Sequence, residues 1–88
     1  MKKILAVCGL GQGTSLILRM NIEQVLNEMG VGADVEHVDV SSASGMSSDL
    51  IVTSAELAQT LAGHESEIVI VNNYFDLEEI KEALQNRI

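Results

Sequence analysis

The sequence predicts an α/β fold in which four parallel strands form one sheet with helices on both faces. Short, nearly continuous apolar runs recur along the chain, as in strands that are buried on both sides. Segments with helical periodicity and recognisable capping residues separate these runs. The 88 residues, of which 47% are hydrophobic, are enough for one modest core. We therefore expect a single domain, residues 1–88, of the Rossmann-like kind.

The first half of the chain predicts a strand, a turn, a helix and a second strand. Residues 3–7 form an apolar run, and a glycine-rich turn follows at residues 9–13. Residues 14–29 have a helical pattern, and we expect the helix to stop at Gly30. Residues 33–40 alternate between apolar and polar, which predicts a strand with one less buried face at an edge of the sheet.

The middle of the chain predicts a loop, a strand and a short helix. Residues 41–48 are rich in serine and glycine, which is typical of an irregular loop. Residues 49–53 form the next apolar run. Thr53, with Glu56 three positions later, resembles a capping box, so we expect Thr53 to be the N-cap of a helix that ends near residue 62.

The last part of the chain predicts a fourth strand at residues 67–71 and a final helix that Asp76 caps. The apolar stripe of that helix is Leu77, Ile80, Leu84 and Ile88, and its solvated face is Glu78, Glu79 and Glu82. Right-handed crossovers lead us to expect the strand order 2-1-3-4. Sites in such sheets lie at the carboxyl ends of the strands where the order reverses, which places Cys8 beside the Thr53–Ser54 turn.

Charge and composition exclude several classes of function. A formal net charge of −8 without basic clusters disfavours binding to nucleic acid and to anionic membranes. A single cysteine forms no internal disulfide, which fits a reducing compartment. No apolar run approaches the roughly 18 residues of a membrane span. We expect a soluble, cytoplasmic protein that does not insert into membranes.

The segment that carries chemistry runs from the end of the first strand into the first helix. It comprises Cys8, Gly9, Leu10, Gly11, Gln12, Gly13, Thr14 and Ser15. Glycines allow backbone N–H groups to approach an anion closely, and successive N–H groups in a tight turn form an anion-binding concavity. The first turn of the helix adds unpaired donors. A thiol in this environment has a lowered pKa, so the pattern predicts a nucleophilic sulfur in a phosphate-binding loop.

Three related motifs fit these residues less well. A P-loop requires lysine after its last glycine, but Thr14 follows Gly13. A dinucleotide fingerprint requires a third glycine where Thr14 stands, and 88 residues hold only half of such a fold. A cysteine phosphatase has arginine six positions after its cysteine, again at Thr14, and the nearest arginine is Arg19. The missing arginine favours a carrier that passes its phosphoryl group on. A phosphatase-like hydrolase, a redox or other thiolate enzyme, and a binding module that does not need Cys8 remain as alternatives.

The same segment resembles the IIB components of the bacterial sugar phosphotransferase system (PTS), and most closely the ascorbate-type IIB proteins within the lactose/galactitol/ascorbate-like group. The matching residues are Cys8, Gly9, Gly11, Gln12, Gly13, Ser15, Arg19 and Met20. The resemblance implies a phosphatase-I-like fold and a protein-Npi-phosphohistidine–sugar phosphotransferase without metal or cofactor. It also implies that Cys8 accepts a phosphoryl group from phosphohistidine of a IIA protein. Cys8 would then pass that group to the sugar bound by the membrane IIC component, which selects the sugar.

The first helix has a core face and a second apolar surface. At 100° per residue its core face is Leu18, Ile22, Val25, Leu26 and Met29. Leu16, Ile17 and Met20 fall on the other side near the loop, and our hypothesis is that they form a docking patch with Leu10. We expect structural roles for His37 and His64, because two separated histidines and one cysteine do not form a metal site.

Overall fold

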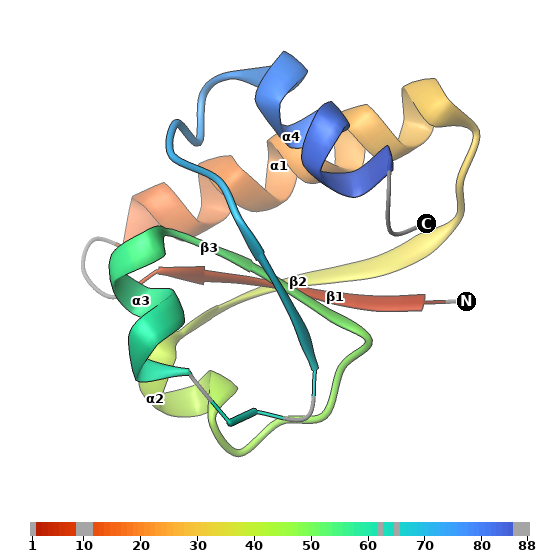
Figure 1. The fold of residues 1–88 in the computed structure, drawn as a ribbon. Coiled ribbons are helices and arrows are strands. Elements are labelled where there is room, and N and C mark those ends of the chain that lie inside the picture. The colour runs from red at the N-terminus through yellow and green to blue at the C-terminus, as the bar shows by residue number, and fades with distance from the viewer. Residues whose placement is uncertain (1, 9–11, 62, 65, 86–88) are drawn as a thin grey trace.

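The four strands form one parallel sheet in the order β2-β1-β3-β4, as the sequence predicts (Figure 1). The structure is a computed structural model that describes residues 2–8, 12–61, 63–64 and 66–85, with the backbone alone for residues 8 and 12–15. The elements are β1 (Lys2–Cys8), α1 (Gln12–Met29), β2 (Ala33–Asp39), α2 (Val40–Ala43), β3 (Leu50–Thr53), α3 (Ala55–Thr60), β4 (Glu67–Ile70) and α4 (Leu77–Gln85). Helices α1 and α4 cover one face of the sheet, and α2 and α3 cover the other.

Strand β1 lies in the centre of the sheet and is buried from Ile4 to Val7. Its side chains alternate between two cores, because successive residues of a strand point to opposite faces. Ile4 and Ala6 pack in the core under α1 and α4, whereas Leu5 and Val7 pack in the smaller core under α2 and α3. A strand with water on neither face explains the unbroken apolar run in the sequence.

Helix α1 buries the predicted face and ends at the predicted glycine. Its residues Leu18, Ile22, Val25 and Leu26 are buried, and Met29 packs at the edge of the same core. Gly30 has a φ of 72°, and the Val31 N–H donates to the Leu26 carbonyl at 2.9 Å. This pair closes the helix as a Schellman motif, in which glycine takes the left-handed conformation without steric cost.

The serine-rich segment begins as a short helix, so the prediction of a loop over residues 41–48 is wrong at its start. Helix α2 spans Val40–Ala43, and Asp39 is its N-cap, with the Asp39 carboxylate accepting from the Ser42 N–H at 2.8 Å. Burial of Ala43 in the smaller core holds the turn against the sheet. Composition indicated a loop because serine is common there, but the acidic cap and one apolar anchor are enough for a single helical turn.

The predicted capping box at the start of α3 is wrong by one residue. The N-cap is Ser54, whose Oγ accepts from the Leu57 N–H at 3.3 Å, and Glu56 lies in the first turn. Thr53 is instead the last residue of β3 and is completely buried. Its hydroxyl donates to the carbonyl of Val7 in β1 at 3.0 Å, so its side chain is used within the sheet.

The acidic start of α4 fixes the loop that precedes it. Asp76 caps the helix as predicted, because its Oδ1 accepts from the N–H groups of Glu78 at 3.0 Å and Glu79 at 3.3 Å. Glu79, expected on the solvated face, also has a local role there: its carboxylate accepts from the N–H groups of Asn72 at 2.6 Å and Asn73 at 3.0 Å, in exposed hydrogen bonds. Of the predicted stripe, Ile80 and Leu84 are buried, Leu77 packs at the core, and Ile88 lies outside the described residues.

Candidate functional site

The candidate site lies at the carboxyl edge of the sheet, where β1 ends and α1 begins. The Cys8 backbone ends β1 in register with Asp39, the last residue of β2. On the other side of β1 lies β3, which ends at Thr53, so strand order reverses at this point. The structure therefore places Cys8 at the switch point that the sequence predicts, where sheets of this kind hold ligands.

The predicted phosphate loop leads into α1 at this edge. Gly9, Leu10 and Gly11 lie outside the described residues, as do the side chains of Cys8, Gln12, Thr14 and Ser15. The backbone of Gln12, Gly13, Thr14 and Ser15 forms the first turn of α1, a helix of 18 residues. The N–H groups of a first turn have no partner within the helix, and the positive end of the helix dipole adds to their attraction for an anion.

Thr53 connects the ends of β1 and β3. Its hydroxyl donates to the Val7 carbonyl, and its own carbonyl accepts from the Val71 N–H at 2.8 Å. The side chain is completely buried, as are those of Val7 and Val71. Sequence analysis missed this role, since the following Ser-Ala-Glu made Thr53 resemble a helix cap and no local pattern indicates a partner 46 residues away.

Asp39 places a carboxylate beside the strand that ends at Cys8. Hydrogen bonding from the Ser42 side chain, and then from the Ser42 backbone N–H, lowers the pKa of Asp39 below its ordinary value. These donors favour the charged form of the carboxyl group. The anion is therefore engaged as the cap of α2 and stays charged at neutral pH.

Arg19 has partners on α1 and β2. Its Nη1 lies 3.1 Å from Nδ1 of His37, and its Nε lies 3.6 Å from Oε1 of Glu23. His37 pairs with Ala6 in the β1–β2 ladder, so the contact ties α1 to the edge strand. The guanidinium is thus used for packing and ion pairing, which agrees with the structural role expected of His37.

The predicted docking residues on α1 are accessible. Met20 is 56% exposed and Leu16 is 39% exposed, one turn apart on the helix, and Ile17 is half-buried between them and the core. Leu10 lies outside the described residues.

Phe75, in the loop between β4 and α4, is a further exposed apolar side chain that the sequence analysis missed. It is 67% exposed and directly follows Tyr74, whose carbonyl accepts from the Asn21 side chain at 2.7 Å. The bond to Asn21 fixes the β4–α4 loop against α1. The available signal was the adjacent pair Tyr74–Phe75, the two aromatic residues of the chain.

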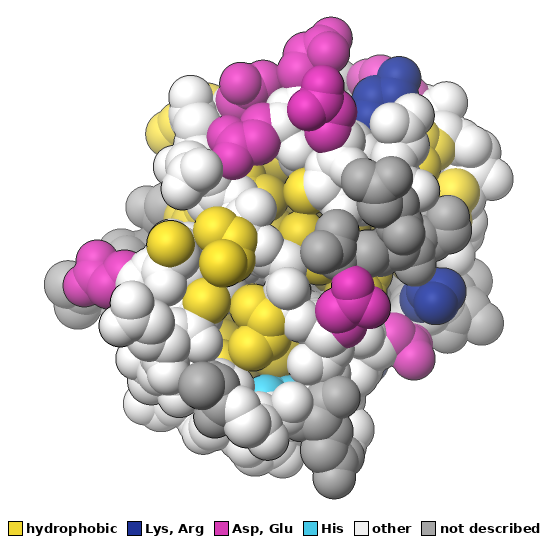
Figure 2. All heavy atoms as spheres, viewed as in Figure 1, with side chains coloured by type: hydrophobic (Ala, Val, Ile, Leu, Met, Phe, Trp, Pro, Cys, Tyr) yellow, Lys and Arg dark blue, Asp and Glu magenta, His cyan; other side chains and the backbone are white. Residues whose placement is uncertain are grey.

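Other apolar side chains gather on the face that β4 and α3 share, while acidic side chains gather over α4 (Figure 2). The largest exposed one on β4 is Ile70. Strand β4 is an edge strand of the sheet, and Ile70 is 48% exposed.

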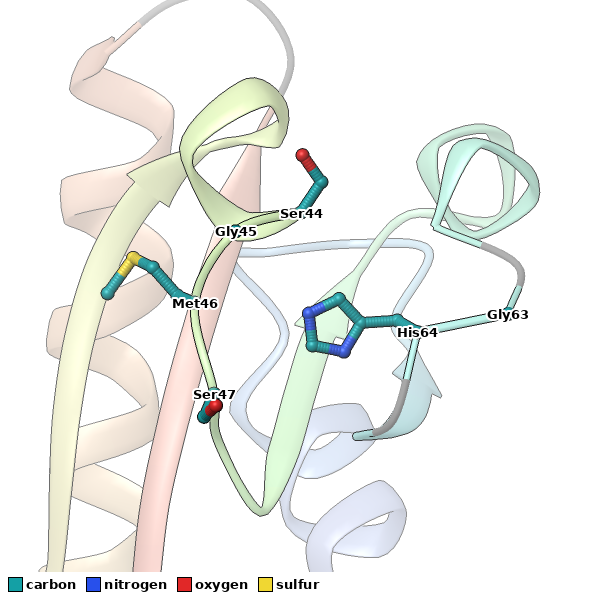
Figure 3. A pocket seen from close by; sticks show the side chains of 6 residues that line it. All are labelled: Ser44, Gly45, Met46, Ser47, Gly63 and His64. Carbon is teal, nitrogen blue, oxygen red and sulfur yellow. The ribbon is translucent and has the colours of Figure 1, made fainter.

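A pocket of about 250 Å³ lies between the segment after α2 and the turn after α3 (Figure 3). It is lined by Ser44, Gly45, Met46, Ser47, Gly63 and His64. Nε2 of His64 lies 2.9 Å from the Ala43 carbonyl, and Nδ1 accepts from the Ser66 N–H at 3.0 Å. With both ring nitrogens used, His64 joins two loops, so the structure agrees with the structural role expected of it.

Comparison with known proteins identifies the family. The family model described as "PTS system, Lactose/Cellobiose specific IIB subunit" matches residues 3–86. The chain belongs to this family. An ascorbate-specific PTS system EIIB component of Mycoplasma pneumoniae is 37% identical over an alignment 84 residues long, which covers 92% of this chain and 88% of that protein. One of Shigella sonnei is 40% identical over an alignment 60 residues long, which covers 64% of this chain and 57% of that protein.

A solved structure has the same fold. The lactose-specific IIB domain of Streptococcus pneumoniae aligns with a TM-score of 0.68 at 23% identity, covering 97% of this chain and 92% of that chain. The predicted four-stranded IIB fold and the resemblance to IIB components are both confirmed.

As a IIB component, the chain is a phosphoryl-carrying phosphotransferase of a sugar PTS, and such components work together with IIA and IIC components. The phosphatase-like alternative gains no support from these matches. Among the described residues, no helix is long and apolar enough to cross a membrane.

Proposed function

We propose that Cys8 is the residue that carries the phosphoryl group and that residues 9–15 form its binding loop. The observation that carries this proposal is the position of Cys8, the single cysteine of the chain, at the carboxyl end of the central strand and directly before α1. A loop between a strand end and a helix N-terminus offers backbone N–H groups to an anion, and these stabilise both the thiolate and the phosphoryl oxygens.

The reaction consists of two displacements at phosphorus. The Cys8 thiolate attacks the phosphorus of a phosphohistidine on a IIA protein; the S–P bond forms, and the P–N bond breaks with its electrons going to the imidazole, which then takes a proton. A sugar hydroxyl held by a membrane IIC protein next attacks the phosphocysteine. The S–P bond breaks, the thiolate is regenerated, and the hydroxyl loses its proton to solvent or a base of the IIC protein. Neither step needs a metal on this chain.

The partners and the substrate follow from the same proposal. The cognate IIA and IIC proteins would be those of an ascorbate-type system, since the relative that matches 92% of this chain is ascorbate-specific. Such a relay takes place on the cytoplasmic side of the membrane. Leu16, Ile17 and Met20, with Leu10, would form the docking patch for both partners, and exposed Phe75 would extend it.

The decisive test is mass spectrometry of the intact chain after incubation with a phosphorylated IIA protein. We expect a gain of one phosphoryl group that peptide mapping assigns to Cys8, and no gain in Cys8→Ser. Adding membranes that contain an ascorbate IIC component and ascorbate should discharge the group to the sugar, whereas lactose should not. Phosphorylation at another residue, or release of free phosphate without sugar, would contradict the proposal.

A further inference from the structure

We propose that Thr53 is a positioning residue for Cys8, holding the peptide unit from which the cysteine leaves the sheet. The inference rests on the proposed role of Cys8 as the phosphoryl carrier. Its basis is the hydrogen bond of 3.0 Å from the Thr53 hydroxyl to the Val7 carbonyl. That carbonyl and the Cys8 N–H belong to the same planar peptide unit, so an interaction that orients one also orients the other.

The bond stands where the ladder between β1 and β3 ends. The paired residues are Ile4 with Leu50, Leu5 with Ile51 and Ala6 with Val52. Next along β1 is Val7, and there the side chain of Thr53 donates to the strand. On the β3 side, the last carbonyl of β1 before Cys8 is therefore held by a hydroxyl, because the paired residues of β1 and β3 end at Ala6 and Val52. On the β2 side, pairing continues to Cys8.

Thr53 is itself held rigidly from the other side. Its carbonyl accepts from the Val71 N–H at 2.8 Å, which ties it to the segment that follows β4. The side chain is completely buried between the ends of strands, with Val7 and Val71 equally buried. A β-branched side chain has few rotamers, so the hydroxyl is directed at Val7 before any substrate arrives. The hydrogen bond from Thr53 to Val7 is therefore already formed, and neither residue has to move during the reaction.

We expect the hydrogen bond from Thr53 to Val7 to aid catalysis by fixing the position of Cys8. Phosphoryl transfer requires the attacking atom, phosphorus and leaving atom to lie nearly in line, so its rate falls steeply when the nucleophile is misplaced. Cys8 serves first as nucleophile and then as leaving group, and a shift of its backbone would affect both steps. Without the hydroxyl, the buried Val7 carbonyl loses a partner and its peptide unit is free to tilt.

Two substitutions separate the hydroxyl from the bulk of the side chain. Thr53→Val keeps the shape and removes the donor, whereas Thr53→Ser keeps the donor and removes a methyl group. Rates of phosphoryl transfer from IIA to Cys8 are measured by rapid quench, and the pH profile of Cys8 alkylation by iodoacetamide reports the thiol directly. Ile51→Val, a buried change in the same strand, controls for lost packing.

We expect Thr53→Val to slow transfer about tenfold to a hundredfold and to shift the alkylation profile to higher pH. Thr53→Ser and Ile51→Val should stay within about twofold of the parent rate, since neither removes the donor. A parent-like rate and profile in Thr53→Val would overturn the inference, and so would a Thr53→Ser variant as slow as Thr53→Val.

A measurement on the parent protein keeps the inference testable if Thr53→Val does not fold. The Thr53 hydroxyl proton should exchange slowly with solvent in proton NMR, because it is buried and bonded; rapid exchange would overturn the proposed clamp. The two proposals also fail differently. If the parent chain is not phosphorylated on Cys8, the proposed function and this inference both fall. If Cys8 is phosphorylated equally fast in Thr53→Val, only the inference falls.

Discussion

Nη1 of Arg19 lies 3.1 Å from Nδ1 of His37, and this contact joins α1 to the edge strand β2. A guanidinium group has donors but no acceptor, so His37 must accept at Nδ1 and carry its proton on Nε2. We expect nitrogen NMR at neutral pH to show the Nε2–H tautomer of His37. In Arg19→Met the preference of His37 for the Nε2–H tautomer should weaken, because the guanidinium donor is gone.

His64 provides an internal control for this experiment. Its Nδ1 accepts from the Ser66 N–H, so it too should be the Nε2–H tautomer, and Arg19→Met should leave its signals unchanged. A protonated Nδ1 on His37 in the parent protein would show that the Arg19 contact is not formed in solution.

The exposed side chains of α1 should matter for transfer and not for folding. Met20→Asp replaces a half-exposed apolar side chain with a charge, so we expect slower phosphoryl transfer from IIA, by about tenfold for the loss of roughly 1.4 kcal/mol of docking energy. The unfolding free energy should change by less than about 0.5 kcal/mol, because the site is on the surface. Stopped-flow transfer assays and urea titrations measure the two quantities.

Gln24→Asp is the matched control for that variant. It introduces the same charge on an exposed position of the same helix, one further turn from the loop. We expect parent-like transfer. Equal rates for Met20→Asp and the parent would show that the docking patch lies elsewhere.

The cap of α2 should make stability depend on pH. The pKa of Asp39 is lowered in the folded chain by bonds from Ser42, so folding favours the charged form. Its contribution is therefore fully present above the ordinary pKa of 3.8 and is lost as the pH falls through the lower folded value. Asp39→Asn keeps a capping oxygen without the charge.

We expect the stability difference between the parent and Asp39→Asn to be constant near neutral pH and to shrink as the pH falls below 3.8. Urea unfolding followed by circular dichroism at a series of pH values measures it. If the difference in unfolding free energy stays the same down to the lowest pH at which both chains are folded, the charge of Asp39 is not what stabilises the cap.

The end of α1 should require glycine for conformational reasons alone. Gly30 has a φ of 72°, and a Cβ built on it would meet nothing within 4 Å. We expect Gly30→Ala to destabilise the chain by about 1 kcal/mol, since an L-residue is strained in this region even where space is free. Gly45→Ala is the control, because Gly45 is not in that conformation and its Cβ would lie 3.9 Å from the Ser42 carbonyl. A larger loss for Gly45→Ala, measured by thermal unfolding, would contradict this account.

The sequence by itself determined every element except α2, the order of the strands in the sheet and the position of Cys8 at a strand end. These features have local signatures. The apolar run of β1 reflects burial on both faces, the period of α1 reflects its single core face, and Gly30 marks a left-handed helix stop. Right-handed crossovers narrow the possible topologies of four parallel strands, and the order 2-1-3-4 expected among them is the one observed.

Only the tertiary structure decided how side chains are used between distant segments. Thr53 resembled a helix cap, yet its hydroxyl donates to the carbonyl of Val7 in β1. A buried hydroxyl needs a hydrogen-bond partner, and the fold decides which group that partner is. When that partner lies in another strand, 46 residues away for Thr53, no spacing in the sequence indicates it.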